Sequence, residues 1–134
     1  MALEAAAFEA RGEAEKSGRP PRSLPLVVAS EGPAVLDWEP LVSYLLGSLS
    51  LGVPAPVLAA QFHASLADGI LAVARHAGAP RVALTGGCFQ NRLLTELAAA
   101  RLKAAGFEVL HLEPVEPTLE DAFVHLVGLQ GGRA

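Results

Sequence analysis

Apolar residues recur at helical spacing over several segments of this chain. The strongest pattern covers Pro56–His76, and its large apolar side chains return every three to four residues: Leu58, Phe62, Leu66, Ile70 and Val73. This period matches one face of an α-helix. Gly78 and Pro80 follow, where a C-cap glycine and a stop proline end a helix. The pattern predicts one long amphipathic helix.

Two further helices and a hairpin are predicted before it. Residues 2–16, rich in Ala and Glu, have a thin apolar stripe, so we expect that helix to be only partly buried. Short apolar runs in the range 26–36 flank a Ser-Glu-Gly-Pro turn and predict a small hairpin. Asp37 then resembles an N-cap, with Pro40 in the first turn of a helix that runs through Leu49.

The second half of the chain predicts a βαβ unit. A strand over Val82–Leu84 stops at a glycine pair, a helix follows over Asn91–Ala105, and Gly106 is its expected C′ residue. Alternation over Phe107–Leu112 predicts the second strand. The two strands should be parallel, with a right-handed crossover. A last helix is expected from Thr118 as N-cap through Val127, before a loose end at residues 131–134.

Composition narrows the class of protein. The 134 residues suit a single domain, and 51% hydrophobic with 18% charged residues indicates a globular chain. A net charge of −4 with scattered basic residues argues against nucleic-acid binding. No run of about 18 uncharged apolar residues is present, so we expect no membrane span. Cys88 is the only cysteine, which excludes an internal disulfide and, with no signal peptide, favours a cytoplasmic protein.

The glycine pair Gly86-Gly87 is the first candidate for chemistry. A strand, a glycine turn and a helix start often present free backbone N–H groups to an anion such as phosphate. Glycines at this place equally serve as a tight turn that lets helix and strand pack closely. The spacing is not GxGxxG, and no lysine follows at P-loop spacing. The residues alone leave both interpretations open.

The neighbouring polar residues have structural alternatives as well. Asn91 is expected to cap the following helix, or to reach a ligand's polar edge. Cys88 is a conceivable nucleophile near a helix start, but a lone cysteine is more often a small buried residue. Glu113 and Glu116 could act as paired carboxylates or simply be solvated.

The histidines do not encode a zinc site. None of the four forms an HxxxH or HExxH pair: His63, His76, His111 and His125. His63 is expected to be buried and hydrogen-bonded beside Phe62. His76 falls in the last turn of its helix, where a cation suits the helix dipole. We therefore expect no metal site.

Several segments resemble one known family in the same order. Val82–Leu94 reads VALTGGCFQNRLL and is similar to the signature GG-x-FQN-R-LL of the HypF carbamoyltransferases, which mature nickel–iron hydrogenases. Leu36–Leu41, LDWEPL, resembles that family's LDW-x-PLL. Ala59–Ala67, AAQFHASLA, resembles its A-x-x-FH-x-x-LA. The resemblance covers about residues 1–112, so we treat 1–134 as a single domain with a divergent tail at 113–134.

The resemblance implies a fold and a ligand. The matching part is the last half of the family's final, Kae1-like domain, an actin-like (ribonuclease H-like) ATPase lobe. The implied fold class is α/β, with a short mixed sheet, a parallel βαβ unit and several packing helices. In that lobe the glycine pair and the asparagine help to bind adenine nucleotide, so ATP would be bound at Gly86, Gly87 and Asn91.

Two departures from the family limit the implied activity. The family's metal-binding histidine pair lies upstream of anything in this sequence, and its closing Asp-Gly-Gly is absent from Val115–Ala122. One hypothesis is therefore a truncated or stand-alone carbamoyltransferase lobe that binds nucleotide weakly and is not active by itself. It would need the missing N-terminal lobe, with a hydrogenase-maturation protein as partner. A second is a non-catalytic module that self-associates or binds a partner. A third, an ABC-transporter ATPase fragment, rests on the tail alone.

Overall fold

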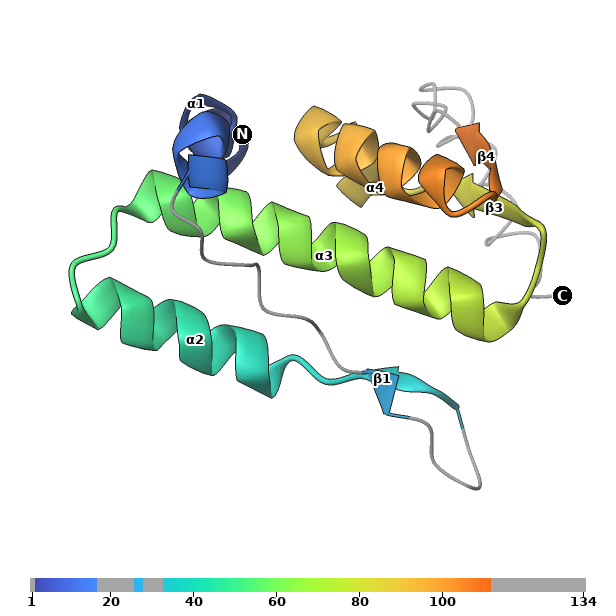
Figure 1. Ribbon diagram of the computed structural model, residues 1–134, viewed down its shortest axis with the longest axis horizontal. Coiled ribbons are helices and arrows are strands. Elements are labelled where there is room, and N and C mark those ends of the chain that lie inside the picture. Colours follow the sequence, from blue (N-terminus) through green and yellow to red (C-terminus); the bar gives the residue numbers. More distant parts are fainter. Residues whose placement is uncertain (1, 17–25, 28–32, 112–134) are drawn as a thin grey trace, which may run out of the picture.

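The computed structural model describes residues 2–16, 26–27 and 33–111 (Figure 1). Its longest helix, α3, runs through the middle of the molecule, with α2 on one side and α1 and α4 on the other (Figure 1). The elements follow in this order: α1 (Ala2–Lys16), β1 (Leu26–Val27), β2 (Val35–Leu36), α2 (Glu39–Ser50), α3 (Ala55–Ala77), β3 (Arg81–Leu84), η1 (Gly87–Gln90), α4 (Arg92–Ala104) and β4 (Glu108–His111).

Helix α3 is the predicted amphipathic helix, one residue longer at each end. Gly78 ends it in the left-handed conformation, with φ +67°, and donates its N–H to the carbonyl of Ala74. Length and composition would let α3 cross a membrane, since its most apolar window has a mean hydropathy of 1.5. Within the molecule 56% of that window is buried, which is the arrangement of a core helix.

Helix α1 crosses α3 at a steep angle and packs against it through its thin apolar stripe (Figure 1). Ala7 and Ala10 are 0% and 4% exposed. Ala7 packs against Ala59 and Ala60 of α3, where small side chains allow two helices to approach closely. The expectation of a partly buried helix is therefore confirmed: Ala7 and Ala10 are buried, while Leu3 is half exposed.

The βαβ unit is present as predicted. Strands β3 and β4 pair in parallel, with Arg81 opposite Glu108 and Leu84 opposite His111. Gly106 ends α4 with φ +90°, as expected of the C′ residue. Helices α3 and α4 cover one face of the strand pair, and the core between them consists of small and branched residues: Ala67, Ala74, Leu84, Ala98 and Leu102. The α/β fold class is confirmed.

The predicted hairpin is also present, as an antiparallel pair of β1 and β2 with Val27 opposite Val35. Within the described ranges it forms a sheet of its own, separate from the β3–β4 sheet. The N-cap of α2 is Trp38 instead of Asp37, although Asp37 Oδ1 accepts the N–H of Glu39 at 3.0 Å. The expected last helix and the Glu113–Glu116 pair lie outside the described residues.

Candidate functional site

The turn between β3 and α4 begins at a glycine that the backbone requires. Gly86 has φ +98° and ψ 167°, a region that residues with a side chain rarely adopt. The chain then forms the short helix η1, in which Phe89 donates to the carbonyl of Gly86 at 3.1 Å. Asn91 donates its N–H to the carbonyl of Cys88 at 3.2 Å. These bonds make the turn compact, and the three residues before Phe89 are exposed: Gly86, Gly87 and Cys88.

Three consecutive backbone N–H groups in this turn have no acceptor among the described residues. They belong to Gly86, Gly87 and Cys88. A Cβ atom added at Gly87 would meet nothing within 4 Å, and its φ lies outside the left-handed range. The fold therefore does not require glycine at position 87. Open space beside unpaired amides is the geometry of an anion-binding turn.

The first turn of α4, by contrast, is already satisfied by this chain. Glu4 of α1 places its carboxylate Oε1 2.6 Å from the N–H of Arg92 and 3.3 Å from the N–H of Leu93. A carboxylate at a helix N-terminus is favoured by the helix dipole and by the free N–H groups there. The amides of α4 are thus not open to an external anion, and the open amides are those of the preceding turn.

Asn91 links this site to the core of α3. Its Oδ1 accepts the N–H of Leu94 at 2.9 Å, which confirms the predicted N-cap. Its Nδ2 lies 2.8 Å from Nε2 of His63, whose Nδ1 lies 2.7 Å from the carbonyl oxygen of Ala59. A carbonyl can only accept, so Nδ1 carries the proton and Nε2 accepts from Asn91. The prediction that His63 is buried and hydrogen-bonded is confirmed, at 2% exposure.

Asn91 keeps part of its hydrogen-bonding capacity in this arrangement. An asparagine amide has two N–H donors and an oxygen with two lone pairs. The bonds to Leu94 and His63 use one lone pair and one N–H. One donor and one acceptor therefore remain for a ligand. The side chain is half-buried, so such a ligand would approach from one side.

The structure does not bring the side chains of Cys88 and the remaining described candidates into the hydrogen-bond network of Asn91 and His63. Cys88 is exposed, which contradicts the expectation of a buried apolar residue. His76 lies at the exposed C-terminal end of α3, as predicted. His111 belongs to β4, while His125 lies outside the described residues. Across residues 2–16, 26–27 and 33–111, no three His, Cys, Asp or Glu side chains gather as a metal site would require.

Arg92 follows the turn and points to solvent. Its Nε donates to Oε1 of Glu96 at 2.7 Å, one helical turn along α4. That hydrogen bond, with the charge of Glu96, raises the pKa of Arg92 above its ordinary value. Arg92 is thus a permanent positive charge near the turn.

Glu4 is the functional neighbour that sequence reasoning missed. It lies 88 positions before Arg92, and nothing in the local pattern of α1 marks it as a capping residue. The sequence indicates only that Glu4 is an acidic residue in the first turn of an alanine-rich helix, and it does not indicate which helix packs against it. The order of the chain alone does not bring these two residues together.

Comparison with known proteins agrees with this architecture. The sequence pattern of one family, the second subdomain of the Kae1-like domain of carbamoyltransferases, matches residues 1–120. The carbamoyltransferase HypF of Synechocystis sp. is 35% identical over 82 residues, which are 61% of this chain and 10% of that protein. The crystal structure of T. kodakarensis HypF matches with a TM-score of 0.59 at 23% identity, over 96% of this chain and 16% of the other.

These matches show the family of this chain and the share of each relative that it spans. The structural likeness supports the fold, and the chain spans only a small part of each relative. The family pattern extends past residue 112, where the resemblance in the sequence ended. Because that pattern covers most of the chain, this protein belongs to the family of second subdomains of the Kae1-like carbamoyltransferase domain.

Proposed function

We propose that this chain is one lobe of a hydrogenase-maturation carbamoyltransferase that binds adenine nucleotide or carbamoyl-adenylate and does not complete catalysis by itself. The observation that carries the proposal is the row of N–H groups at Gly86, Gly87 and Cys88, which have no acceptor within residues 2–16, 26–27 and 33–111. They lie at the carboxyl end of β3, where α/β proteins bind ligands. The family to which the chain belongs supplies the chemical class.

The residues of the turn fit a nucleotide phosphate. Phosphate oxygens accept hydrogen bonds from consecutive backbone amides, and the absence of a side chain at Gly87 allows a close approach. The free N–H of Asn91 would reach a second polar group of the same ligand. ATP would supply the adenylate to which a carbamoyl group is attached. The phosphates would bind the turn and not α4, because Glu4 occupies the start of that helix.

The remaining parts of the reaction would come from outside this chain. It spans 10% of the Synechocystis relative, and its described residues contain no cluster of three metal-ligating side chains. We therefore expect the missing N-terminal lobe to contribute the metal and the other half of the site. A hydrogenase-maturation protein would be the partner, in the cytoplasm, where Cys88 stays reduced.

Calorimetry with ATP and Mg²⁺ tests this proposal. Gly87→Asp adds a negative charge in open space without a clash, so it should fold and repel phosphate. We expect saturable binding to the wild type, with affinity at least about tenfold weaker in Gly87→Asp, which corresponds to about 1.4 kcal/mol. Gly47→Asp adds the same charge at a glycine of α2 with equally open surroundings and should bind as the wild type does. Absence of binding to the wild type would contradict nucleotide binding.

A second candidate function is a non-catalytic module that self-associates. Helix α2 and the residue after it expose a row of large apolar side chains, each more than 45% exposed: Val42, Leu46, Leu49 and Leu51. Beside them, an apolar pocket of about 310 Å³ lies between α1, α2 and α3, lined by residues such as Leu45 and Phe62. Exposed apolar surface of this kind is typical of interfaces. Sedimentation that shows a clean monomer at high micromolar concentration would rule out this alternative.

A further inference from the structure

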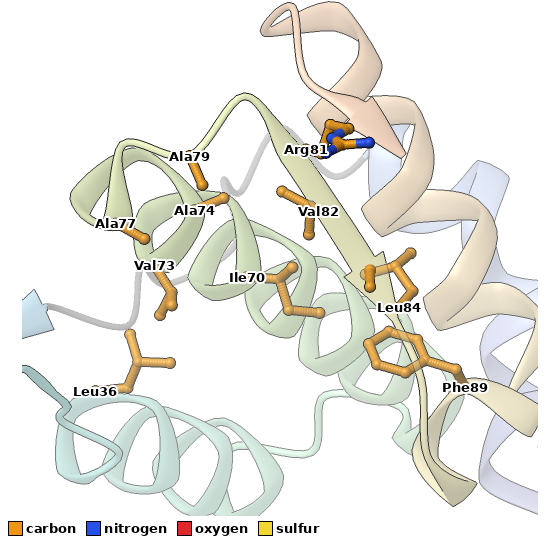
Figure 2. A pocket seen from close by; sticks show the side chains of 11 residues that line it. Leu36, Ile70, Val73, Ala74, Ala77, Ala79, Arg81, Val82, Leu84 and Phe89 are labelled. Carbon is orange, nitrogen blue, oxygen red and sulfur yellow. The ribbon is translucent and has the colours of Figure 1, made fainter. Parts of the chain in front are cut away.

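Helix α3 buries three polar side chains in its first half: Gln61, His63 and Ser65, each at most 4% exposed. Its second half is different, because Ile70 and Val73 line an apolar pocket beside β3, as Figure 2 shows. Burial of a polar side chain lowers the stability of a fold unless a hydrogen bond compensates for the lost water. The partners of the three polar side chains therefore indicate why each is present.

Of these three side chains, His63 is the one that reaches the candidate site within the described residues. Ser65 Oγ donates to the carbonyl of Gln61 at 2.9 Å, which is a bond inside α3. The hydroxyl of Tyr44 donates to Oε1 of Gln61 at 2.9 Å, which joins α2 to α3. Nε2 of His63 lies 2.8 Å from Nδ2 of Asn91, the residue that caps α4. His63 thus connects the buried side of α3 to the end of the glycine turn.

Backbone groups fix the direction of this chain of hydrogen bonds at both ends. The carbonyl of Ala59 can only accept, so Nδ1 of His63 donates to it at 2.7 Å and Nε2 accepts from Asn91. The N–H of Leu94 can only donate, so Oδ1 of Asn91 accepts it at 2.9 Å. A flipped Asn91 amide would bring two acceptors together at Nε2 and two donors together at Leu94. The amide therefore has one favourable orientation.

The bond to His63 adds a second fixed point to the Asn91 side chain. The bond to Leu94 holds the oxygen end of the amide, and Nε2 of His63 holds the nitrogen end. The imidazole is itself bonded at both nitrogens, and it meets the ring of Phe62 edge-on, with ring centroids 5.9 Å apart. Because Nε2 takes one N–H of Asn91, the second N–H is the donor that remains for a ligand.

We propose that His63 is a positioning residue for nucleotide binding: it accepts one N–H of Asn91 and thereby directs the other N–H to an acceptor oxygen of the ligand. A donor whose orientation is already fixed loses less conformational entropy when it binds, so it contributes more to affinity. The inference rests on the proposed nucleotide site at the glycine turn, and it adds to that site a residue from a different helix.

Hydrogen exchange of the Asn91 side chain tests this role without nucleotide. In the ¹H–¹⁵N spectrum of the full chain, we expect one Nδ2 proton to exchange slowly with solvent, because Nε2 of His63 holds it, and the other to exchange fast. His63→Leu removes the acceptor, so both protons should then exchange fast. Equal exchange of the two protons in the wild type would overturn the proposal, and this result does not depend on whether any variant folds.

Calorimetry with ATP and Mg²⁺ measures the consequence for binding. His63→Leu should weaken binding about fivefold, which is within the range of one hydrogen bond. His63→Gln presents a side-chain oxygen at a similar reach and should restore most of the affinity. Ser65→Ala removes a buried hydrogen bond of the same helix that does not involve Asn91, so it should lower stability and leave affinity unchanged. Wild-type affinity in His63→Leu, or an equal loss in Ser65→Ala, would overturn the proposal.

A double-mutant cycle shows whether His63 acts through Asn91. In the Asn91→Ala background the amide is absent, so we expect His63→Leu to weaken ATP binding no further. A second loss of the same size would overturn the proposal, because His63 would then affect the ligand by another route. If the wild type binds no ATP, the proposed function is refuted, and the exchange rates of the two Asn91 protons still decide whether His63 orients the amide.

Discussion

Two adjacent sets of backbone N–H groups follow strand β3, and they differ in whether the described residues supply a hydrogen-bond acceptor. The first turn of α4 is closed: Glu4 accepts from Arg92 and Leu93, and Asn91 accepts from Leu94. The turn before it is open, because Gly86, Gly87 and Cys88 find no acceptor among the described residues. The comparison teaches that a strand–turn–helix unit does not automatically bind an anion at its helix. Here the Glu4 carboxylate occupies the N–H groups at the start of the helix, and the N–H groups without an acceptor among the described residues belong to the glycine turn.

The largest expected effect is a difference in stability between alanine substitutions at Gly86 and at Gly87. Gly86→Ala forces a side chain into a backbone region that is essentially restricted to glycine, so we expect the free energy of unfolding to fall by about 1–3 kcal/mol. Gly87→Ala places a methyl group in open space and should change it by less than about 0.5 kcal/mol. Urea unfolding of both variants measures the difference. Equal losses would show that the strain is not confined to Gly86.

Substitution of Asn91, at the start of α4, has the next largest expected effect on the free energy of unfolding. Asn91→Ala removes the cap of Leu94 and leaves Nε2 of His63 without its donor, so we expect a loss of about 1–2 kcal/mol. Asn91→Asp keeps the capping oxygen but cannot donate to Nε2.

The ¹⁵N spectrum of the His63 ring reports on this bond. It should show a proton on Nδ1 in the wild type. The ring should also respond to Asn91→Asp, while the cap is retained. A ring protonated on Nε2 in the wild type would contradict the assigned hydrogen bond.

Substitution of Glu4 has the smallest of these expected effects on stability, but it tests directly whether Glu4 competes with anions for the start of α4. Glu4→Ala removes the carboxylate that accepts from the N–H groups of Arg92 and Leu93, so we expect the free energy of unfolding to fall by about 1 kcal/mol. It should also open α4 to anions, so that phosphate binds more tightly than to the wild type. Glu9→Ala, an exposed acid on the same helix, is the matched control. Equal phosphate affinity in both variants would show that Glu4 does not compete with anions.

Local signals predicted much of the fold. Gly78 and Gly106 end their helices with positive φ, as their positions after an apolar periodic segment indicated. The parallel pair of β3 and β4 followed from the order strand, helix, strand. These features depend on a few neighbouring residues, whose preferences act within one turn of the chain.

The features that escaped prediction depend on tertiary contacts. The pattern indicated a partly buried helix over residues 2–16, but not that Ala7 contacts Ala59 and Ala60 of α3. The contact between Glu4 and Arg92 joins residues 88 positions apart. The family resemblance pointed to Gly86, Gly87 and Asn91 as ligand residues, and these assignments remain predictions. What the resemblance did not contain is that α4 is closed by Glu4.

One measurement tests the central claim that the open amides, and not the start of α4, form the anion site. Amide chemical shifts are followed by ¹H–¹⁵N NMR while ATP with Mg²⁺ is added to the full chain. The account predicts the largest saturable shifts at Gly86, Gly87 and Cys88, with small shifts at Arg92 and Leu93. Largest shifts at Arg92 and Leu93, or no saturable shift at the three turn amides, would contradict it.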